Sequence, residues 1–160
     1  MYKTAPVTMK QYVLRKAFVY GIPLVITGLI VAIVSVRVLK SNAFVNYLTF
    51  FSVICVTVVI SSVGTGFGAY FADFNIKNPE ELVTGAAGLA YMFVSFIFTA
   101  LVLFFESGVI KNYYMSKLVK AHTFSPLEHW TNFAAVGIIT AAVSAAALWA
   151  GINKLNKMEI

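Results

Sequence analysis

Long apolar stretches alternate with short polar ones along this chain, and each stretch has the length of a bilayer crossing. About 20 consecutive apolar residues in a helix cover the roughly 30 Å of hydrocarbon in a membrane. Four stretches reach that length, and we place them at about residues 17–36, 44–71, 82–105 and 131–152. Because lipid offers no hydrogen-bond partner to the backbone, each stretch is predicted to be an α-helix.

The composition agrees with this pattern. Of the 160 residues, 60% are hydrophobic and only 11% are charged, whereas soluble domains carry about 25% charged residues. A soluble fold of this size could not hide so much apolar surface, so lipid must cover much of it. The predicted fold class is therefore all-α: a polytopic membrane protein in which residues 1–160 form a single transmembrane domain.

The net charge of +6 comes from basic residues that stand beside the apolar stretches. Lys10, Arg15 and Lys16 precede the first stretch, and Lys154 and Lys157 follow the last. This placement is typical of topology signals and of contact with anionic lipid, and no basic folded domain is present that would bind nucleic acid. The positive-inside rule predicts that both termini are cytoplasmic, in a plasma membrane.

The segment before the first stretch, residues 5–16, is predicted to be a short amphipathic helix. Thr8 is a suitable N-cap, and the basic side chains at 10, 15 and 16 can face the cytoplasm. Two interpretations stay open. The segment is an ordinary interfacial anchor, or it is a docking helix for a cytosolic partner.

A polar turn joins the second and third stretches. It contains Asp73, Asn78, Pro79 and Glu80, and such a cluster must lie outside the hydrocarbon because buried charges cost at least about 2.5 kcal/mol each. Asn78 and Pro79 also suit the first positions of a helix, where Glu80 is favoured by the helix dipole.

The segment between the third and fourth stretches, residues 106–130, is longer and mixed. It places apolar and aromatic residues at helical spacing with lysines between them, at Ile110, Tyr113, Tyr114 and Leu118. This pattern predicts a second amphipathic helix that lies in the membrane interface before the last span.

Three glycines near the end of the second stretch, Gly64, Gly66 and Gly68, first suggest a phosphate-binding loop. No Gly-Lys-Ser/Thr follows them and they lie in an apolar run, so close helix packing or a kink is the better interpretation. Glu106 follows the third stretch. A carboxylate there is either interfacial or part of a transport pathway, since ionisable groups at membrane depth tend to be functional.

We expect no enzyme activity, no cofactor and no metal. His122 and His129 are seven positions apart with a proline between them, which does not fit a metal-binding pair on one helix. The single cysteine, Cys55, lies in an apolar run and reads as a small buried hydrophobe. No nucleophile-and-base set or carboxylate pair is evident in the sequence.

Two motifs resemble those of a known family. Ala5-Pro6-Val7-Thr8, followed by a basic and apolar stretch to Lys16, is similar to the cytoplasmic coupling helix of type-2 ABC exporter permeases. The second motif runs from Gly64 through Phe71-Ala72-Asp73-Phe74 to Asn78-Pro79, and it resembles a pattern in a group of bacterial ABC exporters. Such permeases have six spans, and this chain would match the coupling helix and the last four of them.

The resemblance implies a transmembrane permease component that couples ATP hydrolysis by a separate ATPase subunit to substrate export. It places the docked ATPase on the coupling helix, at Pro6, Thr8, Lys10, Arg15 and Lys16, and on the cytoplasmic turn at 73–81. A second permease subunit would complete the pathway. It also implies that the chain is a fragment of a longer permease or a small relative. The alternative is a small four-helix assembly or anchoring protein without transport activity.

Overall fold

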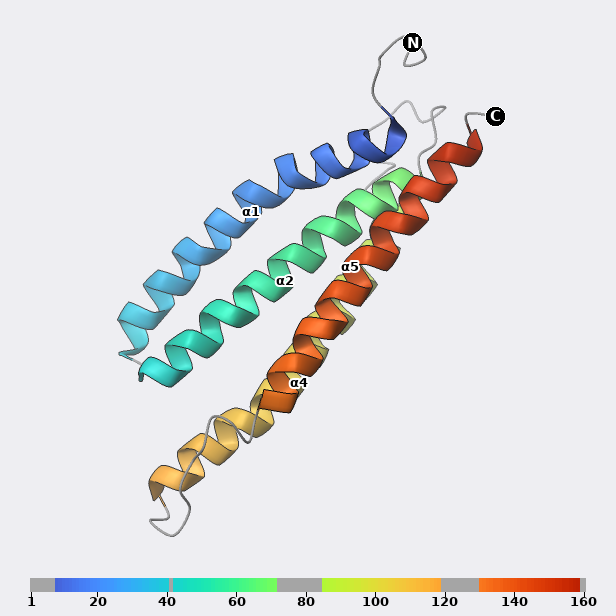
Figure 1. Cartoon of the computed structure of the whole chain (residues 1–160). Coiled ribbons are helices and arrows are strands. Elements are labelled where there is room, and N and C mark those ends of the chain that lie inside the picture. Colours follow the sequence, from blue (N-terminus) through green and yellow to red (C-terminus); the bar gives the residue numbers. More distant parts are fainter. Residues whose placement is uncertain (1–7, 41, 72–84, 119–129, 159–160) are drawn as a thin grey trace.

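The computed structural model describes residues 8–40, 42–71, 85–118 and 130–158 (Figure 1). Almost all of these residues belong to the helices α1 (Met9–Leu39), α2 (Ala43–Tyr70), α4 (Ala86–Leu118) and α5 (Trp130–Met158). All four are long and apolar enough to cross a membrane, and no strand occurs in the described ranges. The prediction of an all-α, multi-pass membrane protein is confirmed.

Helix α2 holds the bundle together. It lies between α1 and α5 in Figure 1, with α4 behind α5, and it packs against each of the other three helices. The core is formed by Val59 and Val63 of α2 with residues of α4 and α5 such as Val102 and Val136. Helix α1 lies outside this core and contacts mainly α2.

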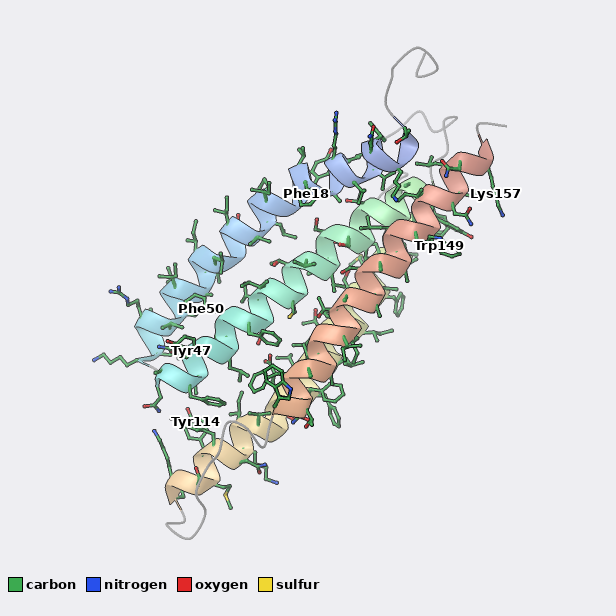
Figure 2. The ribbon with its side chains drawn as sticks, viewed as in Figure 1. Phe18, Tyr47, Phe50, Tyr114, Trp149 and Lys157 are labelled. Atoms are coloured by element: carbon green, nitrogen blue, oxygen red, sulfur yellow. The ribbon has the colours of Figure 1, made fainter. Side chains whose placement is uncertain are left out.

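The outer surface of the bundle is apolar. Phe18, Tyr47 and Trp149 extend outward from three different helices (Figure 2), and Phe18 is 67% exposed. Such a surface is unfavourable in water, but it is the surface expected where lipid tails are the solvent. Successive helices run in alternating directions, so the start of α1 and the ends of α2 and α5 lie at the same end of the bundle (Figure 1).

Helices α2 and α5 approach each other closely at three small residues. A Cβ atom added to Gly66 would overlap the carbonyl group of Ala147, and one added to Gly151 would lie 2.6 Å from the carbonyl oxygen of Gly66. Without a hydrophobic effect between helices in lipid, such van der Waals contact between backbones is a main source of association. The α2–α5 contact therefore requires glycine at positions 66 and 151, where any side chain would hold the two backbones apart.

Helices α1 and α2 are joined by a similar but looser contact. The Ser61 hydroxyl donates a hydrogen bond of 3.1 Å to the backbone oxygen of Ala17, and a Cβ at Gly21 would lie 2.8 Å from the Ser61 oxygen. A Cβ at Gly28 would meet Thr57 and Val53 at 3.0 Å. Two glycines on one face of α1 thus bring it against α2.

The N-terminal segment does not form a helix of its own within the described residues. Thr8 is the N-cap of α1, and its hydroxyl accepts a hydrogen bond of 3.4 Å from the Gln11 amide, as its residue type predicts. From Met9 the helix continues without a break to Leu39. No helix-breaking residue lies between the basic cluster and the start of the span. The predicted amphipathic helix, from Met9 onward, and the first span therefore form one continuous helix.

The amphipathic stretch that was expected before the last span is, as far as Leu118, a continuation of the third span. Helix α4 runs for 33 residues to Leu118, about 50 Å, and its last turns contain the residues expected to form a separate interfacial helix. Tyr113 stacks on Phe44 at the start of α2, with ring centroids 5.0 Å apart, and the Lys117 ammonium lies 5.0 Å from the Tyr113 ring. The contact of Tyr113 with Phe44 keeps the end of α4 on the bundle, and the contact of Lys117 lies within α4 itself.

We predict opposite effects of one methyl group at two glycines of α2. Gly66→Ala should lower the free energy of unfolding by about 1–3 kcal/mol because α5 must move away from the new atom. Gly68→Ala is the matched control, since its Cβ would meet nothing within 4 Å, and it should be neutral or stabilise by up to about 1 kcal/mol. Denaturant-induced unfolding in detergent measures both, and equal midpoints for the two variants would contradict the proposed contact.

Candidate functional site

Glu106 lies within helix α4 rather than at its end. The span was expected to stop at residue 105, but 12 further residues of helix follow Glu106. Lys111, the first basic residue toward that side, is five residues or about 8 Å further along the axis. Glu106 is also buried, at 8% exposed. The carboxyl group therefore lies inside the bundle rather than at the end of a helix.

Ser52 of α2 is the hydrogen-bond partner of Glu106. Its hydroxyl donates to Oε1 of Glu106 and is also 2.7 Å from the backbone oxygen of Leu48. A hydroxyl has one proton, so the two acceptors compete for it. A protonated carboxyl group could instead donate to Ser52, which would leave the Ser52 proton for Leu48. The pair can thus hold a proton in two arrangements.

Polar side chains from α2 and α5 surround this pair. Asn132 of α5 lines the same small cavity as Glu106, and Cys55, one turn after Ser52, has Thr140 of α5 beside its thiol. Glu106 therefore lies where α2, α4 and α5 meet, among groups that can donate or accept hydrogen bonds.

Sequence reasoning singled out Glu106 but missed Ser52. A signal was present, because Ser52, Cys55 and Ser62 recur at helical spacing along one face of the second stretch. Ser62 is buried together with Thr65. A line of small polar residues on one face of an apolar helix indicates an interior face, and it could have predicted which side of α2 meets the carboxyl group.

The three glycines predicted to pack lie in three different surroundings. Gly66 lies against α5, and Gly64 lies beneath the ring of Tyr91, whose Cε2 would be 3.2 Å from an added Cβ. Gly68 has open space at that position, so no helix packs on it within the described structure. Residues 66 and 68 point about 200° apart on a helix, which explains why only one of them faces α5.

The basic residues predicted to dock a partner lie at the start of α1. Lys10, Arg15 and Lys16 are exposed, and they share this side of the bundle with Lys154 and Lys157 at the end of α5. The structure therefore gathers five basic side chains that the sequence separates into two terminal groups. The Lys16 ammonium lies 6.0 Å from the rings of both Tyr12 and Tyr20.

Other predicted site residues lie outside the described residues. They are Pro6 of the coupling motif, Asp73, Asn78, Pro79 and Glu80 of the turn, and the two histidines at 122 and 129. Within the described ranges, no group of three or more potential metal-ligating side chains occurs.

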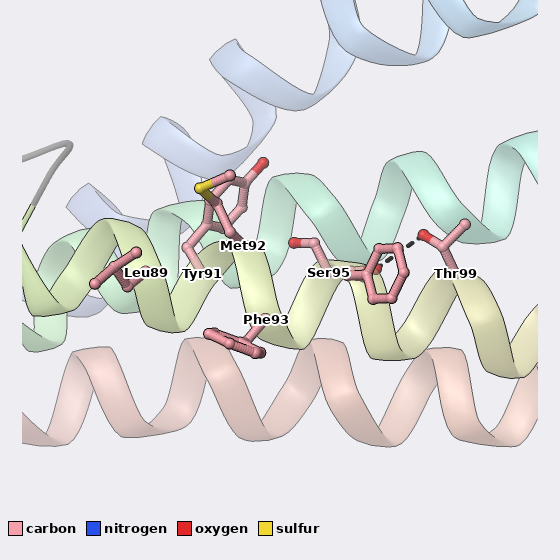
Figure 3. A pocket seen from close by; sticks show the side chains of 7 residues that line it. Leu89, Tyr91, Met92, Phe93, Ser95 and Thr99 are labelled. Carbon is pink, nitrogen blue, oxygen red and sulfur yellow. Dashed lines mark hydrogen bonds between the residues drawn. The ribbon is translucent and has the colours of Figure 1, made fainter.

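A hollow of about 530 Å³ follows one face of α4 (Figure 3). All its lining residues belong to α4, and most are apolar, with Leu89, Met92 and Phe96 among them. Of its polar groups, the Thr99 hydroxyl donates to the backbone oxygen of Ser95 at 2.8 Å, whereas the Ser95 hydroxyl has no hydrogen-bond partner among the described residues. A hollow with one wall and no charged residue is a lipid-facing groove rather than a specific site.

We predict that Ser52 and Glu106 are energetically coupled. Ser52→Ala should destabilise the protein by about 1–3 kcal/mol because it leaves a buried carboxyl group without this donor. In a Glu106→Leu background the same change should cost at least about 1 kcal/mol less. Unfolding of the two single variants and the double variant in detergent completes the cycle.

Ser107→Ala is the control for this cycle, because the Ser107 hydroxyl donates to the backbone oxygen of Phe104 in its own helix. It should show the same cost with and without Glu106. Additive costs for Ser52→Ala and Glu106→Leu would contradict the coupling.

Comparison with known proteins adds a family to this geometry. No curated protein and no solved structure matched the chain in the searches. One protein-family model, described as "Putative ATP-binding cassette", matches residues 1–160. Because the match extends over the whole chain, this membrane protein belongs to that ATP-binding cassette family.

Proposed function

We propose that the chain is the transmembrane permease component of an ABC-type exporter, which couples ATP hydrolysis by a separate ATPase subunit to export of a substrate. The observation that carries this proposal is that a member of an ATP-binding cassette family consists of membrane-spanning helices. Membership in this family is compatible with the ATPase subunit as well as with the permease subunit, and the residues of the chain favour the permease.

ATP binding belongs to another subunit in this proposal. An ABC ATPase holds its nucleotide on a Gly-x4-Gly-Lys-Ser/Thr loop between a strand and a helix. The 160-residue sequence contains no such motif. Its glycine-rich stretch lies inside α2, with Gly66 against α5 and Gly64 beneath Tyr91, so its backbone amides are used within the helix and cannot hold phosphates.

The exposed basic start of α1 is the proposed docking surface for that ATPase. Lys10 and Arg15 are on the first two turns of a helix that continues for 31 residues. Pro23 lies within α1, but the helix continues past it to Leu39. A displacement of the start of α1 would therefore be carried into the span, and α1 rests on α2 through glycine contacts. Movement of the ATPase would therefore bias the arrangement of α1 and α2, as expected of a two-state bundle.

Glu106 is the proposed pathway residue. It contacts Ser52 of α2, and α2 is also the helix on which α1 rests. A displacement of α2 would consequently change the surroundings of the carboxyl group. A second permease subunit, of the same or a different kind, would supply the opposite wall of the pathway.

The docking surface predicts that charge reversal removes the ATPase. Lys10→Glu with Arg15→Glu should lower the amount of ATPase recovered per chain by about tenfold or more, since two favourable charge contacts become repulsive. The measurement is affinity purification of the full chain from its native membranes, with mass spectrometry to identify a co-purifying protein that carries the phosphate-binding loop.

Arg37→Glu with Lys111→Glu is the matched control, because it makes the same change in net charge on the opposite side of the bundle. A cysteine introduced at Lys157, labelled from each side of the membrane, verifies that both variants keep their orientation. Equal recovery of the ATPase with both charge-reversal variants would exclude the docking role. No ATPase with the unaltered chain would favour the anchoring alternative.

A further inference from the structure

A cleft of about 400 Å³ opens between α1, α2 and α4 on the basic side of the bundle. Lys16 and Tyr20 of α1 line it, and Tyr91 contributes from α4. On α2 the wall includes Gly64 and Gly68, and the open space at Gly68 is part of the reason that the helices leave room here. Unlike the groove on α4, this cleft has walls from three helices.

Polarity changes with depth along the cleft. On α1 its lining residues are Lys16, Tyr20 and Leu24, which follow at intervals of four residues and so occupy one face of the helix. They extend about 12 Å into the membrane. On α2 the lining residues run from Gly68 near the mouth to Ile60 at the inner end. The cleft thus has a cationic and hydroxylated mouth and an apolar inner end.

Among the described residues, the donors at the mouth have no hydrogen-bond acceptor. Glu106 is the one acidic residue that the structure describes, and it is bonded to Ser52, so Lys16 has no carboxylate partner in the described ranges. The hydroxyls of Tyr20 and Tyr91 donate to no described residue. By contrast, Ser61 and Thr65 in the wall donate to backbone oxygens of Ala17 and Ser61. Within the part of the chain that the structure describes, one ammonium group and two phenol groups of the cleft are left without an acceptor.

A second cleft on the opposite side of α1 provides a comparison. It lies between α1, α2 and α5, also measures about 400 Å³, and is lined by residues such as Phe18, Ile22 and Leu148 without any charged side chain. An acyl chain alone suits that cleft. Of these two clefts among the described residues, the one at Lys16 combines an apolar end with groups that bind an anion.

We propose that the cleft at Lys16 binds one anionic phospholipid, with its phosphate at Lys16, Tyr20 and Tyr91 and the start of an acyl chain along Leu24 and Ile60. The occupant follows from the graded polarity of the cleft and from the five basic side chains that the described residues gather on this side of the bundle. A free phosphate ion would use the mouth but not the apolar end. This inference does not depend on the proposed exporter function.

The test uses the full chain in a neutral detergent with added phosphatidylglycerol and phosphatidylcholine of identical acyl chains, present in equal amounts. Native mass spectrometry measures, among chains that retain one lipid molecule, the ratio of those with phosphatidylglycerol to those with phosphatidylcholine. The unaltered chain should retain phosphatidylglycerol in preference by about fivefold or more. Lys16→Gln should bring this ratio close to one, and Lys16→Arg should keep it.

Two further variants separate a specific cleft from a general basic surface. Arg15→Gln removes a neighbouring charge outside the cleft and should leave the preference largely intact. Gly68→Leu fills the mouth without changing charge, and it should lower retention of phosphatidylglycerol about fivefold while its unfolding midpoint stays near that of the unaltered chain.

Equal losses for Lys16→Gln and Arg15→Gln, or no effect of Gly68→Leu, would overturn the proposal in favour of a diffuse basic surface. Inorganic phosphate in excess should not displace the lipid. If phosphate displaced it completely, the cleft would be an anion site rather than a phospholipid site, and the proposal would likewise fail.

Discussion

The close contact of α2 with α5 is the interaction on which the rest of this bundle depends. Apolar side chains gain little from each other in lipid, because the tails they leave are as apolar as the core they enter. Gly66, Ala147 and Gly151 instead let two backbones meet. With α5 fixed on one face of α2, α4 completes a shared core around Val63 and Val102, and α1 rests on the face that remains.

That arrangement determines where the polar groups of the interior lie. Ser52 is nine residues past the first residue of α2, and the stacking of Phe44 on Tyr113 aligns α4 so that Glu106 reaches the same level. A buried carboxyl group is costly in a membrane unless it is hydrogen-bonded, and such groups commonly serve transport. The pair gives the proposed permease one interior site whose surroundings change if α2 moves.

The same arrangement separates two uses of the positive charge on one side of the bundle. Lys10, Arg15 and Lys16 are all exposed at the start of α1, but only Lys16 of these three lies near the rings of Tyr12 and Tyr20 at the mouth of a cleft. A protein partner and a phospholipid could therefore be bound by neighbouring residues of one helix. Since α1 is continuous through both, a lipid held at Lys16 would bear on the same helix that the ATPase is proposed to move.

The sequence by itself determined the class of the protein and the number of crossings. Backbone groups in lipid must be satisfied within each helix, so four apolar stretches of sufficient length leave little choice. The cap at Thr8 was also predictable, because it is a local hydrogen bond. The ends of the helices were not, since α1 and α4 continue through segments that hydropathy marks as interfacial. Only the tertiary structure decided which glycine faces α5, that Glu106 is inside the bundle with Ser52, and that Lys16 opens onto a cleft. Each of these depends on how the helices are rotated and aligned against one another, and contacts between residues distant in sequence set that alignment.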